Sequence, residues 1–235
     1  MRSVSTLSPT PMLNILSEDI VHCDRCSRLR EYCLEVARVK RRAFAAWDYW
    51  GKPVPGFGDP AARLWIVGLA PAAHGANRTG RVFTGDRSGD FLFAALHRAG
   101  FANQPASVRR DDGLILRDCF ISAAVRCAPP DNKPLPVEQQ SCAIFLQREW
   151  DLLKNKRAIL ALGKIAWDAT ITLIRSKGIE LAEKPNFGHG AVVALSKRLR
   201  LIGSYHVSQQ NTFTGKLTEA MFDKVLRQCR SACED

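Results

Sequence analysis

The stretch from residue 68 to residue 86 concentrates residue types that could do chemistry. Its glycines let the backbone approach a ligand closely and adopt positive φ. Arg78 and Arg81 offer positive charge for a phosphate group. Phe83 offers a flat face for a base, and Asp86 offers a carboxylate just before a predicted helix. Such glycine-rich loops are typical of nucleotide sites, although this one contains neither the P-loop motif nor the GxGxxG motif.

Eight cysteines form a second group of candidates. Cys23 and Cys26 make a C-x-x-C pair, and Cys127 and Cys142 lie far along the chain. Four thiolates suit either a tetrahedral zinc ion or an iron–sulfur cluster, and their spacing leaves both open. We expect the remaining four in the apolar core, where free cysteines are common: Cys33, Cys119, Cys229 and Cys233. For Cys229 and Cys233, four residues apart in the last predicted helix, a second metal-binding pair is the alternative.

Apolar runs that alternate with helical patterns must position these residues. Strands are predicted at 64–67, 119–125, 158–162 and 199–205, with an added strand at 192–195. This alternation is typical of a parallel sheet with helices on both faces. The carboxyl ends of parallel strands share one edge of the sheet. The glycine-rich stretch, the proline-rich loop 126–134 and the loop at His206 should therefore meet there.

Length, charge and hydropathy narrow the class of protein. The 235 residues suit one α/β domain or two small ones, and we expect a tail at 1–17 followed by a single domain at 18–235. The net charge of +11 favours nucleic acid as partner, with a generic basic surface as the alternative. We interpret the basic run at 38–42 as a solvated face. The sequence has no membrane-spanning run or signal peptide, which predicts a cytosolic location. There, metal ligation is a commoner role for cysteines than disulfide formation.

Three stretches together resemble the uracil-DNA glycosylase superfamily, specifically its family 5, or type b. They are residues 68–86, residues 123–134 with their Ala-Pro-Pro and Asn-Lys-Pro motifs, and residues 206–211. The resemblance extends from about residue 23 to residue 226. It implies an α/β class, a three-layer α/β/α sandwich around a short, mainly parallel four-stranded sheet. It also implies removal of uracil and other deaminated bases from DNA, and a 4Fe-4S cluster as cofactor. Its ligands would be Cys23, Cys26, Cys127 and Cys142.

The resemblance also implies roles for single residues. Phe83 would stack on a flipped base, and His206 would hydrogen-bond the base carbonyl that gains negative charge; a structural histidine is the alternative. Asp86 is our first candidate for activating water, with an N-cap of the following helix as an equal reading. Asn132 and Asn77 could position that water instead. The base pocket would be completed by Asn77, Gly68, Ala70 and Ala72.

Two departures from the family pattern bear on specificity. Related iron–sulfur enzymes carry an acidic residue where Ala72 and Ala73 stand, and an asparagine where Ala123 or Ala124 stands. The missing asparagine predicts a base range wider than uracil that includes hypoxanthine or xanthine.

DNA would be contacted by the loops around the base pocket. The predicted minor-groove residues are Gln209, Gln210 and Asn211. Other predicted contacts, mainly to phosphates, are Arg81, Arg126, Lys133, Thr212, Thr214 and Lys216. We expect a monomer acting on double-stranded DNA in a prokaryotic cytosol or nucleoid, with single-stranded DNA left open. The alternatives are a non-catalytic iron–sulfur DNA-binding protein and a zinc-dependent nucleic-acid module.

Overall fold

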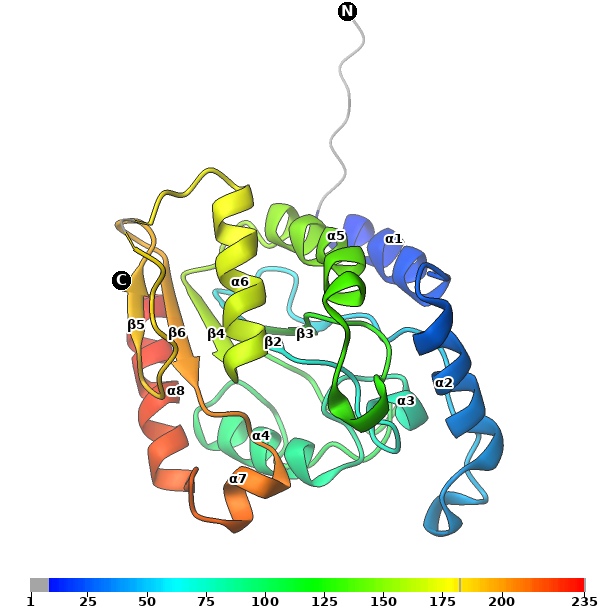
Figure 1. Cartoon of the computed structure of the whole chain (residues 1–235). Coiled ribbons are helices and arrows are strands. Elements are labelled where there is room, and N and C mark those ends of the chain that lie inside the picture. Colours follow the sequence, from blue (N-terminus) through cyan, green and yellow to red (C-terminus); the bar gives the residue numbers. More distant parts are fainter. Residues whose placement is uncertain (1–8, 182, 235) are drawn as a thin grey trace, which may run out of the picture.

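Four five-residue strands form the centre of the sheet in the computed structural model, which describes residues 9–181 and 183–234 (Figure 1). They are β2 (Leu64–Gly68), β3 (Cys119–Ala123), β4 (Ala158–Leu162) and β6 (Arg200–Ser204). They pair in parallel in the order β3-β2-β4-β6. Every residue of these strands except Arg200 is buried, because helices cover both faces of the sheet.

The predicted α/β class is confirmed, and the added strand predicted at 192–195 is present as β5 (Val192–Ala194). The four-stranded sheet implied by the resemblance has two strands too few. Two short strands add antiparallel edges, β1 (Phe57–Gly58) beside β3 and β5 beside β6. The sheet therefore has six strands. Strand β1 is two residues long, so its sequence carries no alternation from which a strand could be predicted.

Helices pack on the two faces through separate apolar cores. One face carries α1 (Pro9–Val21), α5 (Pro136–Leu152) and α6 (Lys164–Ser176), around buried Trp65 and Trp167. The other carries α4 (Arg87–Arg98) and α8 (Glu219–Glu234), around Leu64 and Ile66. Helix α2 (Ser27–Val39) lies to one side (Figure 1). Short helical turns complete the chain: η1 (Arg42–Phe44), α3 (Ala76–Thr79), η2 (Pro130–Asn132) and α7 (Gln209–Phe213).

The predicted tail at 1–17 is wrong for residues 9–17, which belong to α1. Leu13, Leu16 and Ile20 share one face of this helix and are buried in the core that α5 also lines. Asp19 adds an ion pair to Arg148 of α5 at 2.6 Å. The apolar pattern of α1 covers a short stretch of sequence, and α5, against which it packs, lies far along the chain. The sequence therefore did not predict this helix, which is stabilised by its tertiary contact with α5. Residues 1–8 lie outside the described part.

The topology brings three loops to one edge of the sheet, as predicted. The glycine-rich stretch leaves β2, the proline-rich loop leaves β3 and the His206 loop leaves β6. Helices α3, α4 and α7 lie at this edge (Figure 1). In the described ranges, no helix combines the length and apolar character needed to cross a membrane.

Candidate active site

Phe83 and His206 come from distant loops and face each other at this edge. Their ring centroids are 6.2 Å apart, with an interplanar angle of 37°. Phe83 has a φ of 53°, a left-handed conformation that few aromatic residues adopt. Its ring lies directly over Gly68, where an added Cβ would stand 2.7 Å from a Phe83 ring atom. Glycine at position 68 therefore makes room for the aromatic ring at the end of β2.

These two rings line a cavity of about 610 Å³. Its wall combines small apolar residues, two carboxylates, amide side chains and the residues of α7. The lining residues are Leu69, Ala70, Ala72, Phe83, Asp86, Arg87, Ser88, Asp131, Asn132, His206, Ser208, Gln209, Gln210 and Asn211. This volume is in the usual range for a small-molecule site and suits a nucleotide.

The imidazole of His206 is largely removed from solvent. Burial lowers the pKa of its imidazole to about 4, so the ring is neutral at pH 7. The Nδ2 of Asn211 donates a hydrogen bond to the His206 carbonyl at 2.8 Å. Gly163 packs against the ring, since a Cβ there would lie 3.2 Å from the His206 Cβ. The site thus offers a neutral imidazole, which can donate one hydrogen bond without adding a buried charge.

Asp86 is the N-cap of α4 and also lines the cavity, so the two readings of this residue are compatible. Its Oδ1 accepts a hydrogen bond from the Gly89 backbone N–H at 2.9 Å. Burial raises the pKa of the carboxyl group, although the N–H groups of Gly89 and Ser88 and the charge of Arg78 oppose this shift. Gly75 packs so closely that a Cβ there would collide with Oδ2.

The turn η2 places two polar residues at the mouth of the cavity. Asp131 and Asn132 have φ values of 52° and 55°, a conformation that these residue types tolerate better than most. Asn132 was predicted from sequence, whereas Asp131 was missed. The available signal was its position beside Asn132 in the loop that follows β3. Arg87 and Ser88, at the start of α4, were also missed.

Three predicted residues point elsewhere, which corrects their assignment. Asn77 is fully buried, and its Nδ2 donates to the Cys33 carbonyl at 3.2 Å. Arg81 is buried in an ion pair with Asp112 at 2.7 Å, so its charge is not available to DNA. Arg126 is likewise buried, beside Glu149. A polar side chain in a tight loop turns inward where the fold supplies a partner, and the sequence does not show that partner.

Comparison with known proteins decides the family. The model for the uracil DNA glycosylase superfamily matches residues 55–230. The chain belongs to the uracil-DNA glycosylase superfamily. It is 54% identical over 209 residues to a type-5 uracil-DNA glycosylase of Mycobacterium bovis, covering 88% of this chain and 77% of that protein. A type-5 uracil-DNA glycosylase of Mycobacterium leprae is 53% identical over 92% of this chain and 93% of its own length. The type-5 relative from Thermus thermophilus is 47% identical over 91% of this chain and 94% of its own length. The resemblance to family 5 is thereby confirmed.

The four cysteines predicted as cluster ligands in this superfamily member come from three segments. Cys23 follows α1, Cys26 precedes α2, Cys127 follows β3 and Cys142 lies on α5. Cys26, Cys127 and Cys142 belong to one small apolar cluster. Burial and the neighbouring thiols raise the pKa of Cys142 to about 12, against the opposing charge of Arg126. Within the described ranges, no three Cys, His, Asp or Glu side chains are arranged as ligands of a metal ion. Thiolates are suitable donors for a cluster, and the assignment of a 4Fe-4S cluster to these four cysteines stays a prediction.

Several of the residues predicted to contact DNA lie on α7 or directly after η2. Gln209 and Gln210 are exposed on α7, while Asn211 is tied back to His206. Lys133 is exposed in the loop after η2. Phe213, at the end of α7, is 74% exposed and was missed by the sequence analysis, because a single phenylalanine in a polar run carries no signal. This solvent-facing ring is available to an apolar or stacking partner.

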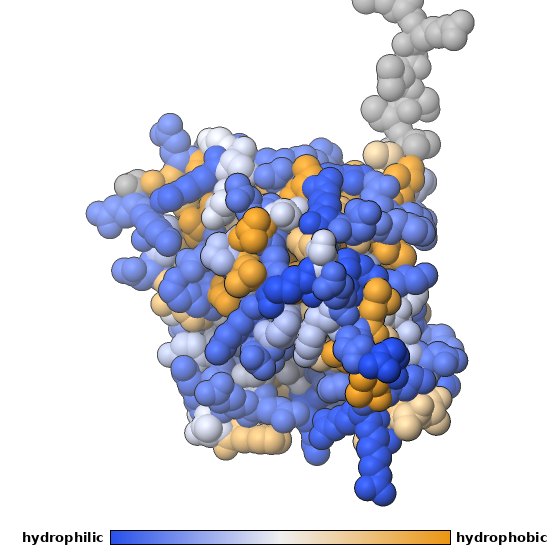
Figure 2. Space-filling view, turned by 45° about the vertical axis from the view of Figure 1, so that its right-hand side comes forward, coloured by the Kyte–Doolittle hydropathy of each residue, from blue (hydrophilic) through white to orange (hydrophobic). Residues whose placement is uncertain are grey.

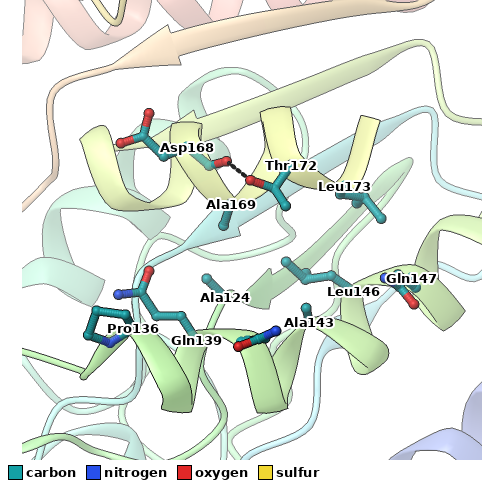
Figure 3. A pocket seen from close by; sticks show the side chains of 11 residues that line it. Ala124, Pro136, Gln139, Ala143, Leu146, Gln147, Asp168, Ala169, Thr172 and Leu173 are labelled. Atoms are coloured by element: carbon teal, nitrogen blue, oxygen red, sulfur yellow. Dashed lines mark hydrogen bonds between the residues drawn. The ribbon is translucent and has the colours of Figure 1, made fainter. Parts of the chain in front are cut away.

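A second hollow, of about 390 Å³, lies between α5 and α6 (Figure 3). Side chains of the two helices face each other across it, with Ala143 on α5 opposite Ala169 on α6. Ala124 contributes from the end of β3. The hollow contains none of the predicted catalytic residues. The cavity at Phe83 and His206 is therefore the candidate active site of this superfamily member.

Proposed function

We propose that this chain is a DNA repair glycosylase. It would flip a uracil nucleotide into the 610 Å³ cavity and hydrolyse the bond between base and deoxyribose, leaving an abasic site. The observation that carries this proposal is the convergence of Phe83 and His206 on one cavity at the carboxyl edge of the sheet. Membership of the superfamily, and type-5 relatives that are similar over most of the chain, support it.

The two rings would divide recognition and catalysis. Phe83 offers a π-face on which a flipped base stacks. His206 would donate a hydrogen bond to the base oxygen that gains negative charge as the glycosidic bond breaks. Because that charge develops only in the transition state, the interaction lowers the barrier more than it stabilises the bound substrate. The lowered pKa keeps the imidazole neutral at pH 7, so this donor adds no charge to the site.

Departure of the base leaves an oxocarbenium-like sugar that water must attack. We assign the orientation of this water to Asp86 and Asn132, which line the same cavity. The ionised Asp86 carboxylate would accept a proton from the water or stabilise the cationic sugar. The capping hydrogen bond uses Asp86 Oδ1 and fixes the side chain at the cavity wall.

The base range should extend beyond uracil to hypoxanthine and xanthine. At the end of β3 stand Ala123 and Ala124, whose side chains cannot form hydrogen bonds with a base edge. Ala70 and Ala72 leave the wall of the cavity small and apolar. Selection would then depend on stacking, on His206 and on the lower cost of flipping a mismatched nucleotide.

A 4Fe-4S cluster bound by Cys23, Cys26, Cys127 and Cys142 would have a structural role. Four thiolate ligands leave no open coordination position on such a cluster. The ligands would join the α1–α2 connection and α5 to the loop that carries Asn132. We further propose that the protein acts as a monomer on double-stranded DNA in the prokaryotic cytosol, where its chromosomal substrate would lie.

The deciding experiment is a substrate panel. Labelled duplexes carrying one uracil, hypoxanthine or xanthine are incubated with the protein, treated with alkali and analysed for strand cleavage. Cleavage at uracil, with none in a matched thymine duplex, supports the glycosylase. Binding of the uracil duplex without cleavage would favour the non-catalytic iron–sulfur DNA-binding protein. Strict uracil specificity would contradict the wider base range. Iron and sulfide analysis with visible absorption tests the cluster against zinc.

A further inference from the structure

The basic run at 38–42, which the sequence analysis assigned to a solvated face, lies beside the active site. Helix α2 ends at Val39, and the chain then turns through Lys40, which has a φ of 57°. Arg41, Phe44 and Trp47 line a hollow of about 810 Å³. This hollow shares Ala72, Asp86, Arg87, Asp131, Asn132 and Gln209 with the base cavity. The basic run therefore adjoins the proposed nucleotide site, on the α2 side that Figure 2 turns forward.

An arginine clamp attaches this segment to the glycine-rich stretch. The guanidinium of Arg78 lies between the rings of Phe44 and Trp47, with its carbon 3.9 and 4.1 Å from their centroids. The Nη2 of Arg78 also donates to the Gly85 carbonyl at 2.7 Å, and its Nε donates to the His74 carbonyl at 2.8 Å. The segment is thus fixed to the residue immediately before Asp86.

A second contact holds the start of the segment. The Arg41 backbone N–H donates to the Tyr49 hydroxyl at 3.4 Å, and that hydroxyl is 3.0 Å from His74 Nδ1. The backbone around Arg41 is therefore positioned before a ligand arrives. A preorganised segment loses less conformational entropy on binding than a free loop does.

Some charged side chains of the run have partners within the described part of the protein, and others do not. Arg38 pairs with Glu35 at 2.6 Å, and the Lys40 Nζ donates to the Ala45 carbonyl at 3.4 Å. The side chains of Arg41 and Arg42 are exposed and make no ion pair or hydrogen bond with any residue that the structure describes. Arg41 lines the hollow that adjoins the base cavity, and Arg42 is the next residue, at the start of η1. Guanidinium groups fit phosphate oxygens in charge and geometry.

We propose that Arg41 and Arg42 bind backbone phosphates of the damaged DNA strand next to the flipped nucleotide. This inference rests on the proposed function and adds a phosphate-binding segment to it. The Phe44–Arg78–Trp47 clamp holds that segment at a fixed place relative to Asp86.

The test compares two double variants that remove the same charge. Arg41→Gln with Arg42→Gln removes the proposed phosphate contacts. Lys197→Gln with Arg198→Gln is the matched control, because these residues are exposed in the turn between β5 and β6, at the opposite edge of the sheet. Affinity is measured over a range of salt concentrations for a short duplex carrying one 2′-fluorinated deoxyuridine, whose glycosidic bond resists hydrolysis.

We expect the slope of log Kd against log salt to fall by about 1.8 in the first variant, from two lost phosphate contacts at about 0.9 each, and to stay near wild type in the control. Single neutral methylphosphonates placed along the damaged strand should weaken binding of wild type, but not of the first variant, at one or two adjacent positions. Equal slopes in the two variants, or a methylphosphonate profile that the first variant leaves unchanged, would overturn the inference. Wild type that binds the duplex but never excises uracil would overturn the proposed function instead.

Discussion

Protonation of His206 should destabilise the fold as the pH falls. The pKa of this imidazole is lowered by burial from 6.5 to about 4, so the unfolded chain binds the proton more readily than the native one between these values. Stability linked to His206 is therefore complete above pH 6.5 and is lost as the pH falls towards 4. At about 1.4 kcal/mol per pKa unit, the full loss is about 3 kcal/mol, and about 2 kcal/mol of it falls between pH 7 and pH 5.

Urea unfolding of wild type and His206→Gln at these two pH values measures this loss. The variant lacks the titrating group, so its free energy of unfolding should fall by about 2 kcal/mol less than that of wild type. His97→Gln, at an exposed position on α4, is the matched control and should retain the wild-type pH dependence. The reasoning is refuted if both variants follow wild type. An NMR titration that gives the His206 imidazole a pKa near 6.5 would refute the reasoning even if the variant fails to fold.

Three further substitutions test the site. Asp86→Asn keeps a good N-cap but removes the charge, so uracil excision should fall about 100-fold or more with little change in melting temperature; near-normal turnover would exclude a role for the carboxylate in activating water. Gly68→Ala places a Cβ 2.7 Å from the Phe83 ring and should displace it, which predicts slower excision with an unchanged circular dichroism spectrum. Phe213→Ala removes an exposed ring and should weaken duplex binding about tenfold without loss of stability. The control Val192→Ala, at an exposed position on the edge strand β5, should leave the Kd unchanged. Equal Kd values for the two variants would show that Phe213 does not contact DNA.

The order of elements along the chain was enough to predict that the loops of the candidate site meet. Phe83 and His206 lie far apart in sequence, yet each follows a buried parallel strand. Parallel strands end at one edge of the sheet, so their following loops must converge. A local signal, a carboxylate before an amphipathic pattern, gave the N-cap as one of the two readings of Asp86.

Side-chain direction within the loops depended on the tertiary structure. Asn77 and Arg81 lie in the same glycine-rich stretch as Phe83, but local turns direct them to the Cys33 carbonyl and to Asp112. The sequence showed only that the run at 38–42 is positively charged. Its position beside the cavity depends on the packing of Phe44 and Trp47 against Arg78. Periodicity and residue type are properties of neighbours along the chain, so the sequence by itself determined the fold class and the meeting of the loops. Which buried partner satisfies a polar side chain depends on segments brought together only by folding, so the tertiary structure alone decided which loop residues line the cavity.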